Sequence, residues 1–160
     1  MQGDKEVIAF LNEQLTAELT AINQYWLHYK LQENNGWVKL AKHTRRESIE
    51  EMEHADTLAE RIIFLDGLPN FQKLSPLRIG QTVTEMFECD MKVELEAVDR
   101  LRRGIKLMRA KDDVTSANIF EKILANEEEH IDYLETQLAL LKQLGEPLYL
   151  AQLVEQPESS

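Results

Sequence analysis

The sequence is poor in residues that break, bend or cross-link a chain. Its 160 residues include one Cys, four Pro and six Gly. Cys89, being alone, forms no internal disulfide and supplies no four-cysteine metal site. No apolar run reaches the roughly 20 residues that span a bilayer, and the N-terminal sequence lacks the basic start and apolar stretch of a signal peptide. We therefore expect a cytoplasmic protein that does not enter a membrane.

Basic residues are the second shortage. The chain holds 18 Lys and Arg against 29 Asp and Glu, which gives a formal net charge of −11. Such a charge repels nucleic acid and anionic lipid and attracts cations. Because 43% of the residues are apolar, the chain is not expected to be disordered, and its length suits one domain with one core. We expect a cation-attracting surface and no nucleic-acid partner.

Four long segments carry the periodicity of amphipathic helices. Most of the few Gly and Pro lie between these segments, and Gly104 inside the third is the exception. Asp4 is a candidate N-cap for the first helix, and Thr82 with Glu85 forms a candidate capping box for the third. The expected helices cover about 4–33, 38–65, 82–110 and 114–143, with a short fifth helix near 147–154.

The connections decide how these helices are arranged. The links after the first and third helices are short, so each joins an antiparallel pair. The link from Asp66 to Gln81 has 16 residues; fully extended it reaches about 50 Å, while a helix of about 27 residues is about 40 Å long. It can therefore cross the whole bundle and leave helices two and three parallel. The sequence predicts an all-α four-helix bundle with one long crossover over 1–145, followed by a short fifth helix and a flexible tail over 146–160.

Ionisable residues occupy the middle of every predicted core stripe. A walk along each helix in alternating steps of three and four meets apolar residues at both ends and charged ones between them. An unpaired buried carboxylate carries a penalty on the order of several kcal/mol even after relaxation, so four of them need compensating charge. The residues at mid-height are Glu18 in the first helix, Glu51 and His54 in the second, Glu94 in the third, and Glu127 and His130 in the fourth.

Bound metal ions would supply that charge. Four carboxylates carry four negative charges with both imidazoles neutral, and two divalent ions cancel them. Oxygen and imidazole ligands without thiolate suit iron, manganese or zinc. The second and fourth helices each carry a Glu-x-x-His pair on one face, and two such pairs plus one Glu from each remaining helix form the ligand set of di-iron carboxylate bundles. Each pair's Glu lies 33 residues after the Glu of the preceding helix, so we expect a site with pseudo-twofold symmetry.

The residues alone leave three other interpretations open. The charges could belong to solvated helix faces. The chain could form a structural helical assembly whose buried acids pair with Arg and Lys, although the core stripes contain neither. It could also be a manganese or mixed Mn/Fe oxidase or peroxidase that stores nothing, which particle size would separate from a hollow shell.

At this point the sequence resembles the bacterioferritins, a haem-containing branch of the ferritins. The resemblance rests on both Glu-x-x-His motifs, on Glu18 and Glu94, on the opening MQGDKEVIAFLNEQLTAELTAINQYWLH and on EEEHIDYLETQL near the end. It extends from about Met1 to Leu153. Ordinary ferritins lack the second Glu-x-x-His, and rubrerythrin relatives need cysteine ligands that one Cys does not provide.

The resemblance implies an iron-storage ferroxidase with a ferritin-like fold. It implies a homo-oligomeric shell of 24 subunits, oxidation of Fe(II) by O2 or H2O2 at a di-iron centre in each subunit, and a ferric mineral inside. The six mid-height residues would be the ligands, with Glu51 and Glu127 bridging the two irons. A small iron–sulfur ferredoxin would be the partner for iron release.

The resemblance also implies haem b at a twofold interface, held by one Met from each subunit, which maps to Met52. Independently, Met52 lies one position off the core stripe, so its side chain is expected to point aside from the metals. Leu19, Asn23 and Trp26 form a neighbouring stripe on the first helix, also displaced from the core. The alternative is a subunit interface without a cofactor, because Met is a common gap-filler.

Several positions depart from the family pattern or have an open assignment. Arg46 and Glu50 stand where the family often has the His and Asp of an inner-surface iron site, so that site is in doubt, and Leu148 makes ion passage at the fourfold pore less expected. Tyr25 is a candidate electron or radical donor, or a core tyrosine that hydrogen-bonds a ligand carboxylate, and the two are compatible.

Four further ionisable residues lie on the same helices as the predicted ligands. Glu47 and Asp90, which lie on core stripes, are expected to orient the metal ligands. His28 and His43 have no partner in register, and no role is assigned to them.

Overall fold

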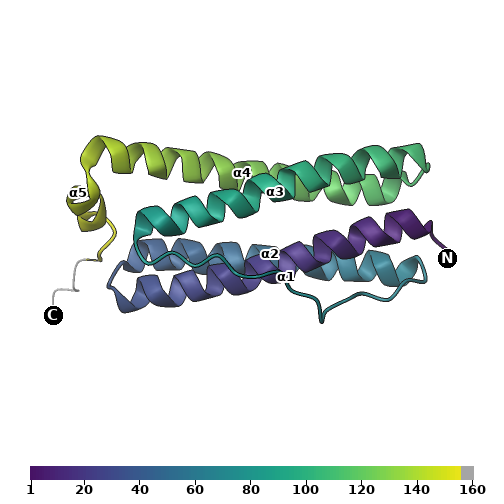
Figure 1. The fold of residues 1–160 in the computed structure, drawn as a ribbon, viewed down its shortest axis with the longest axis horizontal. Coiled ribbons are helices and arrows are strands. Elements are labelled where there is room, and N and C mark those ends of the chain that lie inside the picture. The colour runs from purple at the N-terminus through teal and green to yellow at the C-terminus, as the bar shows by residue number, and fades with distance from the viewer. Residues whose placement is uncertain (156–160) are drawn as a thin grey trace.

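The computed structural model describes residues 1–155, and within them it contains helices and no strands. The five helices are α1 (Lys5–Asn34), α2 (Val38–Phe64), α3 (Val83–Ala110), α4 (Val114–Leu144) and α5 (Glu146–Ala151). The four long ones lie side by side in a bundle, and α5 turns away at one end (Figure 1). The predicted all-α bundle is confirmed, and the four long helices begin and end within one residue of expectation. None of these helices is long and apolar enough to cross a membrane.

The helix ends have the predicted chemistry. The side chain of Asp4 accepts hydrogen bonds from the backbone N–H groups of Glu6 and Val7, which have no partner inside the helix. Thr82 and Glu85 form the reciprocal capping box at the start of α3. Gly145 ends α4 with φ of 77°, a conformation that favours glycine.

The fifth helix is shorter than predicted. It was expected near 147–154 but ends at Ala151, because the chain then turns and the Leu153 carbonyl accepts the backbone N–H of Lys39 at 2.9 Å. This contact ties the end of the described chain to the start of α2. The predicted frayed tail at 156–160 lies outside the described residues.

The long connection crosses the bundle as expected. It leaves the end of α2 and runs along the length of the molecule to the start of α3, so that α2 and α3 point the same way (Figure 1). Four polar side chains of α1 accept backbone N–H groups of this crossover at 2.8–3.0 Å, which holds the irregular segment against the helix. The pairs are Asn12 with Asn70, Thr20 with Ser75, Gln24 with Arg78, and His28 with Gly80.

The apolar core is divided into two clusters. One contains Leu11, Leu58 and Phe120 among others, and the second contains Leu40, Phe87 and Tyr149 among others. The buried carboxylates belong to neither cluster, although the predicted core stripes of α2, α3 and α4 each run from one cluster to the other. Sequence spacing therefore correctly predicts a bundle with two apolar ends and a charged middle.

Candidate metal centre

All six predicted ligands come together in the middle of the bundle, each from the helix that was expected to carry it. Glu18, Glu51, Glu94 and Glu127 are 1–2% exposed, and His130 is 5% exposed. Their ligand atoms form two sets of four, and the atoms within each set lie within 4.8 Å of one another. The sets are Glu18, Glu51, His54 and Glu127, and Glu51, Glu94, Glu127 and His130. Glu51 and Glu127 belong to both sets.

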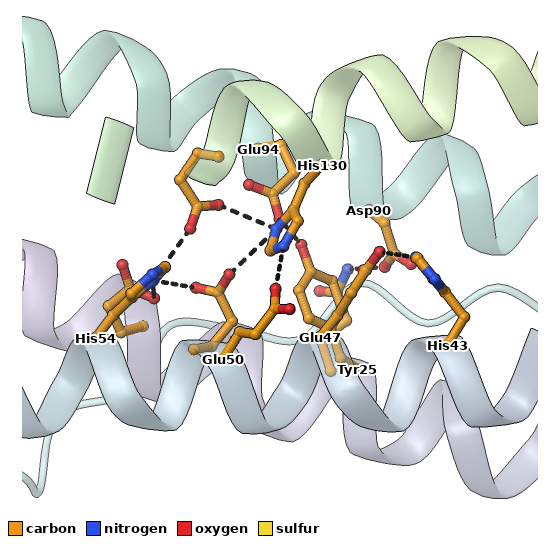
Figure 2. A network of polar contacts seen from close by, with 12 residues as sticks. Tyr25, His43, Glu47, Glu50, His54, Asp90, Glu94 and His130 are labelled. Carbon is orange, nitrogen blue, oxygen red and sulfur yellow. Dashed lines mark hydrogen bonds and ion pairs between the residues drawn. The ribbon is translucent and has the colours of Figure 1, made fainter. Parts of the chain in front are cut away.

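The two imidazoles face this cluster in equivalent ways (Figure 2). His54 Nδ1 lies 3.5 Å from Glu18 Oε2, 3.6 Å from Glu51 Oε2 and 3.3 Å from Glu127 Oε1. His130 Nδ1 lies 3.3 Å from Glu94 Oε1, 3.4 Å from Glu51 Oε1 and 3.7 Å from Glu127 Oε2. Each histidine therefore approaches one carboxylate of its own and the two that both sets share, which gives the predicted pseudo-twofold arrangement.

The cluster contains buried polar atoms that lack partners. Half of the ten unpartnered side-chain atoms in the described chain belong to the predicted ligands. They are Glu18 Oε2, Glu51 Oε1, His54 Nδ1, Glu94 Oε2 and Glu127 Oε1. Within residues 1–155 none of the four carboxylates pairs with Lys or Arg, which removes the main observation that a purely structural assembly would need. Buried polar atoms are nearly always satisfied, so these fit oxygen- and nitrogen-bound cations.

Protonation compensates part of the buried charge when no metal is bound. Burial lowers the pKa of His54, but the carboxylates of Glu127, Glu18 and Glu51 outweigh it and raise that pKa to about 12. The pKa of His130 is likewise raised to about 12, chiefly by Glu127 and Glu51 against the effect of burial. Burial and the charges of Glu127 and Glu18 raise the pKa of Glu51 well above its usual value. The metal-free cluster therefore holds protons where metal ions would bind.

Three side chains orient the predicted ligands. The Tyr25 hydroxyl donates a hydrogen bond to Glu94 Oε1, so this fully buried tyrosine contacts a ligand carboxylate directly. Gln14 Nε2 donates to Glu18 Oε1 at 2.8 Å. Glu50 Oε2 lies 2.8 Å from His130 Nε2, the ring nitrogen that faces away from the cluster. Carboxylates in this position fix the orientation of metal-binding histidines and raise their basicity.

Gln14 and Glu50 were not found from the sequence as contacts of the site. Gln14 lies one turn before Glu18, and Glu50 directly precedes Glu51. Helical spacing was therefore a signal for Gln14, but an amide at that position is equally compatible with a surface. Glu50 was considered only as a departure from the family pattern.

The prediction that Glu47 and Asp90 orient the metal ligands was wrong, because both carboxylates contact other side chains. Glu47 Oε1 lies 2.5 Å from His43 Nε2, and Asp90 Oδ1 accepts from Gln24 Nε2 at 2.8 Å and lies 3.0 Å from His28 Nδ1. These carboxylates lie one helical turn beyond the cluster, where other buried polar groups reach them first. Their charges still act on the site: Glu47 helps to raise the pKa of His130.

His28 and His43, which received no role, each have partners. His28 is fully buried between Asp90 and the backbone N–H of Gly80. His43 stacks on Tyr133 with ring centroids 3.7 Å apart, and Arg46 Nη2 lies 3.1 Å from its Nδ1. The partners of His28 come from α3 and the crossover, so register within one helix did not indicate them. His43 contacts Tyr133 of α4, but its other partners, Arg46 and Glu47, lie three and four residues further along α2, so helical spacing was a signal for those two contacts.

The predicted haem ligand lies on the outside of the bundle. Met52 is 53% exposed and belongs to neither metal-ligand set. Trp26 on α1 is 40% exposed, and the Arg45 guanidinium lies over its ring, 5.4 Å from the centroid. Leu148 on α5 is 65% exposed. Met52 therefore points aside from the metal cluster, as its position in the stripe indicated.

Comparison with known proteins decides the family. Residues 8–144 match the ferritin-like domain family. The bacterioferritin of Streptomyces coelicolor is 68% identical over 158 residues, which cover 99% of this chain and 95% of that protein. The bacterioferritin of Mycobacterium leprae is 60% identical and is covered completely.

The chain belongs to the bacterioferritin family. Solved bacterioferritin structures agree: that of Mycobacterium tuberculosis superposes with a TM-score of 0.97 at 58% identity, covering 99% of this chain and all of the other. The bacterioferritin of Rhodobacter capsulatus matches over the full length of both chains with a TM-score of 0.97 at 46% identity. That structure is described as containing a metal-free dinuclear site and a haem iron in a crystallographic special position.

Proposed function

We propose that this bacterioferritin stores iron and oxidises Fe(II) at a di-iron centre formed by Glu18, Glu51, His54, Glu94, Glu127 and His130. The observation that carries the proposal is the pair of four-atom ligand sets that share Glu51 and Glu127, with unpartnered oxygens aimed into them. A pair of iron ions bound there supplies the redox chemistry that passes electrons from Fe(II) to O2 or H2O2.

The residues around the cluster prepare it for that chemistry. Glu51 and Glu127 would bridge the two ions, an assignment supported by their oxygens, which lie 3.3–3.7 Å from both histidines. Gln14 holds Glu18, Tyr25 holds Glu94 and Glu50 holds His130. Burial excludes bulk water from the carboxylates. Tyr25, whose pKa burial and the nearby acids raise well above its usual value, stays protonated and keeps its hydroxyl hydrogen on Glu94.

Storage needs more than one chain. We propose a homo-oligomeric shell, with 24 subunits as the family resemblance implies, and a ferric mineral inside it. Haem b would lie between two subunits, with Met52 of each chain as an axial ligand. Met52 is exposed and belongs to neither apolar cluster of its own chain. Its side chain is therefore available to contact a group shared with a second subunit. A small iron–sulfur ferredoxin is the proposed electron donor for iron release.

Replacing one shared carboxylate tests the centre. Glu127→Gln keeps the shape of the side chain but removes a charge from both ligand sets. The matched control is Glu129→Gln, an exposed acid on the same helix. Rapid Fe(II) oxidation, followed by absorbance after mixing with O2, should be lost in the first variant and retained in the second. Equal rates in both variants would contradict the proposal, and a monomeric or dimeric active particle would favour an oxidase that stores nothing.

A further inference from the structure

A cavity of about 470 Å³ lies between α1, α3 and the crossover, outside the metal centre. Its wall includes Glu13 and Ala17 from α1, Lys73 from the crossover and Arg100 from α3. Ala17 also lines a second, much smaller space of about 10 Å³, whose other walls include Glu18, Glu51 and Glu127. Ala17 therefore separates the large cavity from a small space that reaches three of the proposed metal ligands.

Arg100 lines the large cavity and Gln14 lines the small space, so the two residues lie between the cavity and Glu18. Gln14 is fully buried, and its amide nitrogen donates to Glu18 Oε1 at 2.8 Å. Its amide oxygen accepts from Arg100 Nη1 at 3.4 Å, a long contact. Arg100 Nε lies 3.5 Å from Glu13 Oε1 and has no hydrogen-bond partner in the part of the chain that the structure describes. The contacts that lead from the cavity to Glu18 therefore pass through Arg100, whose guanidinium makes long contacts with both Gln14 and Glu13.

The space between the large cavity and Glu18 is too small for a metal ion to pass. A space of about 10 Å³ holds at most one water molecule, so a hydrated ion cannot pass without movement of a side chain. Arginine keeps its positive charge at any physiological pH, and a cation in the cavity must approach it. Glu13, whose side chain is 53% exposed, offers that cation a carboxylate at the entrance.

We propose that Arg100 and Gln14 form a gate that controls the rate at which divalent cations pass from this cavity to Glu18. A cation that pairs with Glu13 competes with Arg100 for the one acidic partner that it has within residues 1–155, and Arg100 then moves away from Gln14. The amide oxygen of Gln14 becomes free to face the ion beside Glu18. Arg100 and Gln14 are positioning residues, because neither belongs to the metal-ligand sets. The inference rests on the proposed di-metal centre, whose ligands are the destination.

Binding of Co(II) to the metal-free, full-length protein tests the gate without any oxidation step. Stopped-flow absorbance gives the rate of binding, and equilibrium titration gives the number of ions per chain. Arg100→Gln should bind Co(II) about tenfold faster, a factor equivalent to ~1.4 kcal/mol of barrier, with two ions per chain as before. Arg100→Lys, which keeps the charge, should remain close to the unmodified protein.

Two further variants distinguish an effect on the gate from a general effect of removing charge or disturbing α3. Arg103→Gln removes the same charge from an exposed position on α3, where Arg103 pairs with Asp99, and should leave the rate unchanged. Glu13→Gln removes the carboxylate at the entrance and should slow binding. Rates for Arg100→Gln equal to or below those of the unmodified protein would overturn the gate. Absence of any paired Co(II) binding in the unmodified protein would instead overturn the proposed di-metal function.

Discussion

At the scale of single residues, the two imidazoles of the cluster hold protons that metal ions must displace. The pKa of each histidine is raised to about 12 by the surrounding carboxylates, while a metal-bound imidazole must be neutral on the binding nitrogen. At pH 7 the unmetallated protein therefore carries a proton on both His54 and His130. Their charged forms contribute most to the stability of the metal-free fold below the unfolded pKa of 6.5, and this contribution is lost as the pH rises from there toward about 12.

Metal binding should consequently release protons. Loading the protein with Zn(II) at pH 7 is expected to release about two to three protons per chain, because each ligand histidine loses one and Glu51, whose pKa is also raised, gives up the proton it holds. Metal affinity should fall as the pH is lowered, since protons compete for the same atoms. Calorimetric titration in buffers with different ionisation enthalpies measures the count. Metal binding without proton release would contradict the assignment of the histidines as ligands.

Glu50 makes the two halves of the centre unequal. It contacts His130 Nε2, whereas the equivalent position in the other half, directly before Glu127, is Asn126. Glu50→Gln should therefore weaken the metal position beside His130 by about 10- to 100-fold, the usual effect of losing a carboxylate behind a ligand histidine, and leave the other position nearly unchanged. A two-step Co(II) titration measures both affinities, with the exposed Glu53→Gln as the control. Equal weakening of both steps would rule out this asymmetry.

The sequence predicted the six clustered residues and the hydrogen bond from Tyr25 to a ligand carboxylate, but not the contacts of Gln14 and Glu50. Glu18 and its five companions share one register on their helices, and burying charge on a core stripe has few physical solutions. Gln14 and Glu50 follow no such rule, because a hydrogen bond depends on side-chain conformation and on the distance between two helices. Neither quantity is encoded by spacing along one helix.

At the scale of elements, the helices were predictable and the path of the crossover was not. Periodicity and caps defined the four long helices, and length alone showed that the 66–81 segment could span the bundle. The segment has no periodic pattern of its own. It is held by side chains of α1, including Gln24 and His28, that accept its backbone N–H groups. Those polar residues become interpretable only when the segment lies against them.

Gly104 explains the one interruption inside a predicted helix. A Cβ atom at this position would lie 2.3 Å from the ring of Phe120 and 3.2 Å from that of Phe10. Gly104→Ala is therefore expected to destabilise the chain by about 1–3 kcal/mol through overpacking, despite the higher helix propensity of alanine. Thermal denaturation measures the change, with the exposed Lys106→Ala as the control on the same helix. A rise in melting temperature would show that the aromatic rings yield easily.

At the scale of the whole molecule, the acidic residues that cause the negative net charge fall into two groups, one in the buried metal cluster and one on the surface. Four of the acids behind the net charge of −11 are buried in the cluster, so with two divalent metals bound the remaining excess is −11 + 4, or −7. The surface remains acidic enough to attract Fe(II) at long range. One chain can hold the centre, whereas storage needs the proposed shell.

The proposed haem site needs two chains, because both subunits share the group. Met52→Leu preserves size and hydrophobicity but removes the sulfur that would bind haem iron. Protein produced with ample haem should show a Soret band that this variant lacks, while its Fe(II) oxidation remains rapid because Met52 belongs to neither ligand set. An unchanged Soret band in the variant would contradict the assignment of Met52.

We propose above all that six residues on four helices bind two metal ions inside the bundle of a single chain. Anomalous X-ray scattering at the iron edge, from crystals soaked anaerobically in Fe(II), tests it most directly. We expect two peaks per chain, one beside His54 and Glu18, the other beside His130 and Glu94, with Glu51 and Glu127 near both. Iron bound only at surface acids, or a peak that lacks these ligands, would contradict it.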